Sequence, residues 1–106
     1  MAELQCDETC PVARANQVLG GKWTTLIIRD LLQGKMRYSE LQRSLVGISP
    51  RMLAQRLAQL EGAELVTKTI YPTVPPKTEY ALTPKGRRAE NIIAAMAEFG
   101  MGLDAG

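Results

Sequence analysis

The stretch SPRMLAQRLAQLEG, residues 49–62, carries the strongest structural signal in the chain. Ser49 followed by Pro50 is typical of a helix start, because serine caps the first free amides and proline has no amide to leave unpaired. At about 100° per residue, leucines fall together on one face of this segment: Leu53, Leu57 and Leu60. Residues 50–61 are therefore expected to form an amphipathic helix that buries its leucines.

The opposite face of this helix has side chains of the types that can read DNA bases. Arg51, Gln55 and Gln59 lie there, with Met52 at the flank. Arginine and glutamine make bidentate hydrogen bonds to guanine and adenine edges in the major groove. We expect these residues to contact bases, and we expect Arg56, nearer the core boundary, to meet a phosphate. A merely solvated polar face, which most amphipathic helices have, is the alternative.

A shorter helix upstream completes a helix-turn-helix. Ser39 is expected to cap a helix over residues 40–45, and the glycine-containing segment 46–48 forms a tight connection to the next helix. Side chains that start or line these helices are expected to anchor the DNA backbone: Arg37, Ser39, Arg43 and Ser49. Residues 35–56 hold five basic side chains against one acid, Glu40, which fits a phosphate-facing patch.

The pattern changes from helical to extended after Gly62. Residues 65–71 are rich in β-branched side chains and predict a strand, and residues 79–82 predict its partner. The proline-rich segment 72–76 cannot continue a ladder and predicts a stiff hairpin tip. Three residues on or beside this hairpin are candidate DNA contacts: Lys68, Lys77 and Thr78. Lys77, next to the tip, suits a wing along the minor groove, although a surface lysine with no partner is the alternative.

Helices are expected on both sides of this unit. The first begins at Pro11 and ends at Gly20-Gly21, and a central apolar helix follows over residues 22–33. Thr83-Pro84 begins a last helix that reaches about Gly100. The order is four helices, two strands and a helix. It predicts a mainly α protein with a small β-hairpin, a winged helix-turn-helix.

The two terminal helices offer apolar surface that a small core cannot absorb. The last helix has a seam spaced 4, 3 and 4 residues apart, with Ile93 alongside, as in a coiled coil: Ile92, Met96, Phe99 and Leu103. The first helix adds Val12, Ala15 and Leu19. A two-fold homodimer would bury both faces and place two recognition helices about 34–36 Å apart, on an inverted-repeat operator. Closure of the subunit's own core is the alternative.

Length and composition limit the remaining possibilities. At 106 residues the chain predicts one domain over residues 10–106, after a flexible arm at residues 1–9. No apolar run is long enough to cross a membrane, and the acidic N-terminus does not resemble a signal peptide, so we expect a cytoplasmic protein. The absence of histidine excludes Ser-His and Cys-His catalysis. We expect no enzyme activity, cofactor or metal.

Short motifs along residues 10 to about 100 resemble a known family. They are CPV at 10–12, GGKW at 20–23, RYSEL at 37–41, GISPR at 47–51, YPTVPP at 71–76 and YALTPKG at 80–86. Together they closely resemble the HxlR family of winged-helix regulators, relatives of the MarR group. The resemblance implies a homodimer that meets through its terminal helices and binds near promoters, as repressor or activator. It also implies a response to oxidants, electrophiles or aldehydes through an N-terminal cysteine, whose family position Cys10 matches.

The two cysteines, Cys6 and Cys10, leave three possibilities open. The dipole of the first helix would favour the thiolate of Cys10, which suits a redox switch through oxidation, alkylation or a disulfide within or between subunits. The thiols could instead stay reduced without a regulatory role. A metal site would need further ligands than these two thiolates. Their spacing is not the Cys-x-x-Cys of oxidoreductases, so it does not indicate an enzyme.

The interpretation we favour is a sequence-specific DNA-binding regulator that responds to oxidants or electrophiles through Cys10. Two alternatives remain: a regulator controlled by a small molecule in the dimer interface, and a winged helix that binds a protein. The second has weak support, because the exposed face of residues 50–61 is basic rather than apolar. A small thiol enzyme is a more distant possibility, since no catalytic base accompanies the cysteines.

Overall fold

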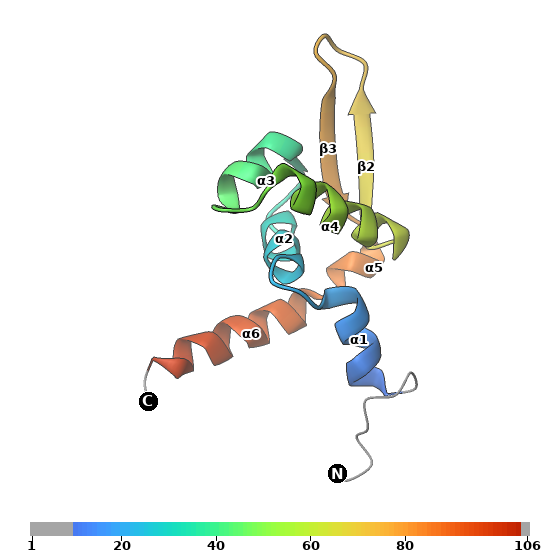
Figure 1. Ribbon diagram of the computed structural model, residues 1–106. Coiled ribbons are helices and arrows are strands. Elements are labelled where there is room, and N and C mark those ends of the chain that lie inside the picture. The colour runs from blue at the N-terminus through green and yellow to red at the C-terminus, as the bar shows by residue number, and fades with distance from the viewer. Residues whose placement is uncertain (1–9, 105–106) are drawn as a thin grey trace.

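The computed structural model, which describes residues 10–104, has a helix-turn-helix beside a projecting β-hairpin (Figure 1). The elements follow in the order α1 (Pro11–Leu19), α2 (Thr24–Leu31), β1 (Met36–Arg37), α3 (Tyr38–Ser44), α4 (Pro50–Gly62), β2 (Val66–Tyr71), β3 (Lys77–Leu82), α5 (Pro84–Arg87) and α6 (Glu90–Leu103). The predicted winged helix-turn-helix is confirmed. In the described part of the chain no helix is long and apolar enough to span a membrane.

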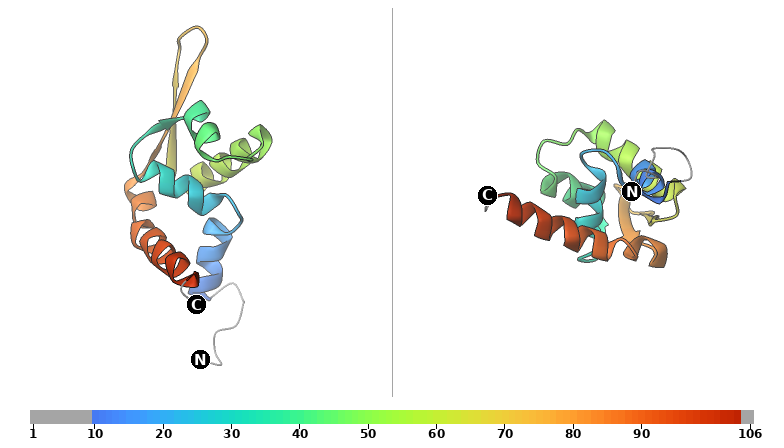
Figure 2. Two further views of the ribbon diagram at one scale, coloured as in Figure 1. Left: turned by 90° about the vertical axis from the view of Figure 1, so that its left-hand side faces the viewer. Right: turned by 90° about the horizontal axis from the view of Figure 1, so that it is seen from below.

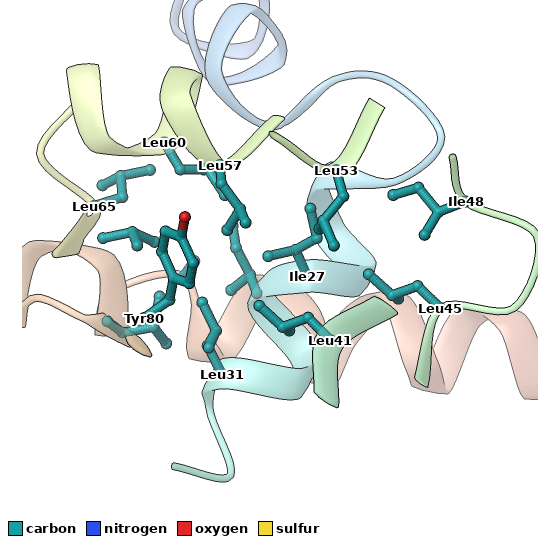
Figure 3. Close-up of a cluster of buried hydrophobic side chains, with 14 residues drawn as sticks. Ile27, Leu31, Leu41, Leu45, Ile48, Leu53, Leu57, Leu60, Leu65 and Tyr80 are labelled. Atoms are coloured by element: carbon teal, nitrogen blue, oxygen red, sulfur yellow. The ribbon is translucent and has the colours of Figure 1, made fainter. Parts of the chain in front are cut away.

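The core forms where α4 packs over α2 and the base of the hairpin (Figure 3). Leu53, Leu57 and Leu60 of α4 are at most 1% exposed, as their helical spacing predicts. They meet Ile27 and Leu31 of α2, which are fully buried. The leucine face of α4 is therefore held inside the subunit, and its opposite face is turned to solvent.

A third strand pairs with the predicted hairpin: residues 36–38 are expected to be extended from the sequence, but their pairing is not. β1 pairs with β3 through Met36↔Tyr80 and Arg37↔Glu79, which gives an antiparallel sheet in the order β1-β3-β2. Beyond its base the hairpin projects from the body, and most side chains of β2 are exposed (Figure 1). The wing is thus a ribbon whose outer half no other described element covers.

The structure corrects two expected helix boundaries. α3 begins at Tyr38, so Ser39 lies within the first turn and does not cap it; the amide of Arg37 donates instead to Glu40 Oε1 at 2.8 Å. The final helix is broken into α5 and α6. Gly86 of α5 lies so close to the Leu65 carbonyl that a Cβ would not fit, and α6 turns away from this docking point to pack on α2.

The terminal helices leave the body on the side opposite the tip of the wing (Figures 1 and 2). Neither α1 nor α6 contains a fully buried residue. Leu19 and Ile93 do pack partly against the subunit's own core. Most of the apolar surface of both helices is therefore left uncovered in one subunit.

Candidate nucleic-acid interface

The helix-turn-helix is fixed by polar contacts at the start of α4. Ser49 Oγ accepts a hydrogen bond from the amide of Met52 at 3.0 Å, the N-cap contact that its position predicts. The hydroxyl of Tyr38, at the start of α3, donates to the Pro50 carbonyl at 2.8 Å. These contacts tie the beginnings of α3 and α4 together, so the two helices present one surface.

The exposed face of α4 has the predicted base-reading side chains. Arg51, Gln55 and Gln59 are all exposed, and Ala54 and Ala58 lie exposed between them. Arg51 takes part in no ion pair among residues 10–104. Two small alanines would let the helix approach a groove closely, while the longer side chains would reach past them. Burial of Arg51 and Gln55 would have contradicted a nucleic-acid interface, and both are accessible.

Arg56 and Met52 differ from the rest of the predicted set. Met52 is half-buried and packs against the core. Arg56 Nη1 donates to Gln59 Oε1 at 3.1 Å, and its Nε is buried with no hydrogen-bond partner in the described residues. A Cβ on Gly21 would lie 3.0 Å from Arg56 Nη2. Arg56 thus packs against the turn between α1 and α2. In this structure its guanidinium is engaged in contacts within the protein, and the phosphate contact stays a prediction.

The predicted backbone-binding residues are exposed around α3 and the wing. Arg37 and Ser39 lie at the start of α3, Arg43 lies in its last turn, and Ser49 caps α4. Lys68 is exposed on β2 opposite Tyr80 of β3. Basic side chains therefore border the exposed face of α4 from both neighbouring elements.

A cleft lies between α3 and the wing. Lys77 and Thr78 are the first residues of β3, paired in register with Tyr71 and Ile70. The cleft has a volume of about 410 Å³ and lies between the start of α3 and the start of β3. Its lining residues are Arg37, Tyr38, Ser39, Pro76, Lys77 and Thr78. The structure thus brings together four predicted contact residues from two distant segments.

The sheet beside this cleft contains a polar network that the sequence analysis missed. Glu79 Oε1 accepts a hydrogen bond from the Tyr71 hydroxyl at 2.8 Å and lies 3.8 Å from Lys35 Nζ. The hydrogen bond to Glu79, followed by the charge of that carboxylate, raises the pKa of Tyr71 above its usual 10.0. Only the strand register brings these residues together, so no local sequence pattern could have indicated the network.

Cys10 lies at the N-cap of α1 and is half-buried. Its carbonyl accepts the amide of Arg14 at 2.9 Å, which begins the helix. The other predicted redox residue, Cys6, lies outside the described residues, as does the predicted arm at residues 1–9. Within residues 10–104, no three side chains of the metal-binding types gather as a site.

The predicted dimer residues divide into two groups. Leu19 and Ile93 pack partly on the subunit's own core, so part of the predicted seam serves the monomer. The remainder are exposed: Val12, Ala15, Ile92, Met96, Phe99 and Leu103. Phe99 is 72% exposed and lines an open apolar groove of about 640 Å³ along α6. Met101, which is 73% exposed, belongs to the same helix and was missed.

A helix-turn-helix that presents arginine and glutamine from its second helix, followed by an antiparallel wing, defines a winged-helix protein of the DNA-binding type. The chain belongs to the HxlR-like helix-turn-helix family, which matches residues 18–104. It is a transcriptional regulator of that family, as the sequence resemblance implied.

Three relatives illustrate the match. A Methanothermobacter thermautotrophicus protein described as an uncharacterized HTH-type transcriptional regulator is 42% identical over 91 residues, covering 86% of this chain and 70% of the relative. The crystal structure of a regulator assigned to the MarR family, from Porphyromonas gingivalis W83, superposes with a TM-score of 0.86 at 47% identity, over 90% and 93% of the two chains. The oxidised form of the redox regulator HypR superposes with a TM-score of 0.83 at 40% identity, over 88% and 96%.

Proposed function

We propose that the protein is a homodimeric, sequence-specific DNA-binding regulator of the cytoplasm whose α4 enters the major groove. The observation that carries this proposal is the division of α4 into two faces. Its leucines are buried, whereas Arg51, Gln55 and Gln59 are exposed with no other described element covering them. Arg37, Ser39, Arg43 and Ser49 would hold the DNA backbone beside the groove, and Lys68, Lys77 and Thr78 would hold it from the wing.

The terminal helices support a two-fold dimer. The exposed apolar side chains of α6 follow one another along a single helix that contributes no fully buried residue to its own subunit. Contiguous exposed apolar surface of this kind is typical of an interaction site. A second copy of the chain, packed through α1 and α6, would cover it and would direct the two α4 helices to successive turns of an inverted repeat.

The regulatory signal we propose is an oxidant or electrophile that acts at Cys10. The relative HypR is described as a redox regulator. Cys10 begins α1, one of the two helices of the proposed dimer face. A disulfide, or an adduct on this sulfur, would alter the packing of α1 and with it the spacing of the two recognition helices.

DNA binding is tested by selecting duplexes from a randomised pool with the reduced protein. We expect enrichment of an inverted repeat, and we expect Arg51→Ala to weaken binding to it about 5- to 150-fold, with relaxed specificity at one base pair per half-site. Arg87→Ala is the matched control, because Arg87 is exposed on α5, outside the proposed interface. No enrichment, or equal binding by Arg51→Ala to every duplex, would contradict the proposal.

A further inference from the structure

The cleft between α3 and the wing forms where the chain leaves the sheet. β1 pairs with β3 only as far as Arg37↔Glu79, and the following residues, Tyr38 and Ser39, turn into α3. The first residues of β3, Lys77 and Thr78, therefore have no strand beside them on this edge. The gap between the two segments is the cleft of about 410 Å³ described above.

Two cations share one face of the sheet beside this cleft. Residues paired directly across antiparallel strands point to the same face, as do residues two apart along one strand. Arg37 is paired with Glu79, and Lys77 lies two residues before Glu79, so all three side chains share a face. Such diagonal neighbours have Cα atoms about 7–8 Å apart, so the long side chains of Arg37 and Lys77 can reach a common point.

The cations of the cleft are not neutralised within the described part of the chain. Arg37 and Lys77 are both exposed, and neither takes part in an ion pair there. Glu79, the acid on their face, is engaged by Lys35 and by the hydroxyl of Tyr71. The carboxylate of Glu40 is near, but it is engaged as the cap on the Arg37 amide. Both cations of the cleft are thus available to bind an external anion.

The hydroxyl of Ser39 completes the lining. Ser39 was expected to cap α3, but Arg37 occupies the N-cap position, so the Ser39 hydroxyl is left exposed at the cleft. Thr78 also lines the cleft, but its side chain, two residues before Tyr80, belongs to the other face of the sheet. An arginine, a lysine and the Ser39 hydroxyl at one open cleft are a donor set that suits the oxygens of a phosphate.

We propose that this cleft binds a single backbone phosphate of duplex DNA, gripped between Arg37 and Lys77. The inference rests on the proposed DNA binding and adds to it: Lys77 is assigned to a phosphate that α3 also holds, and not to the minor groove. The phosphate would connect the helix-turn-helix to the wing, which is otherwise uncovered over its outer half. The wing would then be fixed in place only on DNA.

Salt dependence separates one shared phosphate from two independent contacts. For B-DNA, the logarithm of the binding constant falls with the logarithm of salt concentration by about 0.9 per neutralised phosphate. The proposed homodimer has two such clefts, one in each subunit. Because either cation alone still faces a shared phosphate, Arg37→Gln and Lys77→Gln should each change this slope little, whereas the double variant lowers it by about 1.8 for the dimer. Independent phosphates would give a loss of about 1.8 for each variant and about 3.6 for the double variant, which would overturn the proposal.

Neutral phosphate analogues locate the site on the DNA. The probe is the duplex selected by the wild-type protein, made with one methylphosphonate at each backbone position in turn. We expect a position where the analogue weakens wild-type binding about tenfold or more but does not further weaken the double variant. Arg87→Gln is the matched control, because Arg87 is exposed on α5, outside the proposed interface, and this variant should keep the wild-type pattern.

The outcomes distinguish this proposal from the one it rests on. If the wild-type protein binds the selected duplex but the double variant keeps every methylphosphonate effect, the shared phosphate is wrong and the DNA-binding proposal stands. If Arg37→Gln and Lys77→Gln suppress the effect at two different positions, the two cations hold separate phosphates. If the wild-type protein selects no duplex, both proposals fail.

Discussion

At the residue scale, Arg56 connects α4, the proposed recognition helix, to the turn that ends α1. Its guanidinium packs beneath Gly21, whose φ of +96° is a backbone conformation that favours glycine. Its hydrogen bond to Gln59 holds the guanidinium along α4. A movement of α1 would therefore change the contact between Gly21 and Arg56 first, because the α1–α2 turn directly follows α1.

We expect Gly21→Ala to reduce the free energy of unfolding through two effects. The positive φ strains any side chain by about 1–2 kcal/mol, and the added Cβ would crowd Arg56. Gly47→Ala is the matched control, since Gly47 has a φ of +94° but its Cβ would meet only Trp23, at 4.0 Å. Urea unfolding should show a larger loss for Gly21→Ala, and adding Arg56→Ala should recover the difference. Equal losses at both glycines would contradict the Arg56 contact.

Tyr80 is expected to make the free energy of unfolding vary with pH in the alkaline range. Burial is the main cause that raises the pKa of Tyr80 above its usual 10.0 in the folded protein. A group whose folded pKa is raised contributes stability that is complete below its unfolded pKa and is lost as pH rises through the folded pKa. The free energy of unfolding should therefore fall from about pH 10 upward, and Tyr80→Phe should make the fall shallower. Urea unfolding of both proteins between about pH 8 and pH 11 measures this, and parallel curves would contradict it.

At the element scale, one face of α4 stabilises the fold, and its opposite face is the proposed DNA-binding surface. Leu57 is 1% exposed at the centre of the core, so Leu57→Ala should cost about 2–5 kcal/mol in the free energy of unfolding. That loss is a large share of the roughly 5–15 kcal/mol typical of a domain. Gln55→Ala, on the exposed face of the same helix, should leave unfolding unchanged within about 0.5 kcal/mol. Thermal unfolding followed by circular dichroism checks both, and equal melting temperatures would contradict the assignment of faces.

The elements also show how far the sequence could predict the structure. The start of α4 at Pro50 and the burial of its leucines were predicted correctly, because cap and period are local properties of residues 49–62. The pairing of β1 with β3 and the break between α5 and α6 were not predicted. Both arise from contacts between segments far apart in sequence, such as Gly86 against the Leu65 carbonyl.

The same distinction applies to the candidate site. Arg51, Gln55 and Gln59 were identified from one helical period, and the structure leaves them exposed. The joint lining of one cleft by Arg37 and Lys77 depends on the register of β1 against β3, which no pattern in either segment encodes.

At the scale of the whole molecule, the described part of one subunit is long and open, with extents of 56 × 35 × 24 Å. The wing and the terminal helices point away from each other (Figure 1). This separation places the proposed DNA contact and the proposed self-association at opposite ends of the molecule. A change at one end can then be tested for its effect at the other.

We expect Phe99→Asp to convert the proposed dimer to a monomer, because it places a charge in the apolar surface of α6. The subunit should remain folded, since α6 contributes no fully buried residue to the core. Val74→Asp is the matched control: Val74 is an apolar residue even more exposed than Phe99, but it lies at the tip of the wing. Sedimentation equilibrium should show a monomer only for Phe99→Asp, with weaker binding to the inverted repeat. A dimer for both variants would place the interface elsewhere.

The proposed switch at Cys10 would connect the two ends, because α1 belongs to the proposed dimer face and its terminal turn contacts Arg56 of α4. Treatment with the thiol oxidant diamide should change binding to the selected duplex, as two thiols lose two electrons and two protons to diamide and form one disulfide. Cys10→Ser should abolish the change and leave binding by the reduced protein intact. Cys6→Ser, run on a non-reducing gel, identifies the partner sulfur: a covalent dimer that persists in this variant joins Cys10 of two subunits, whereas its loss implicates Cys6. If diamide changed DNA binding by Cys10→Ser as strongly as it does in the wild-type protein, the role proposed for Cys10 would be wrong, and the proposed DNA interface would still stand.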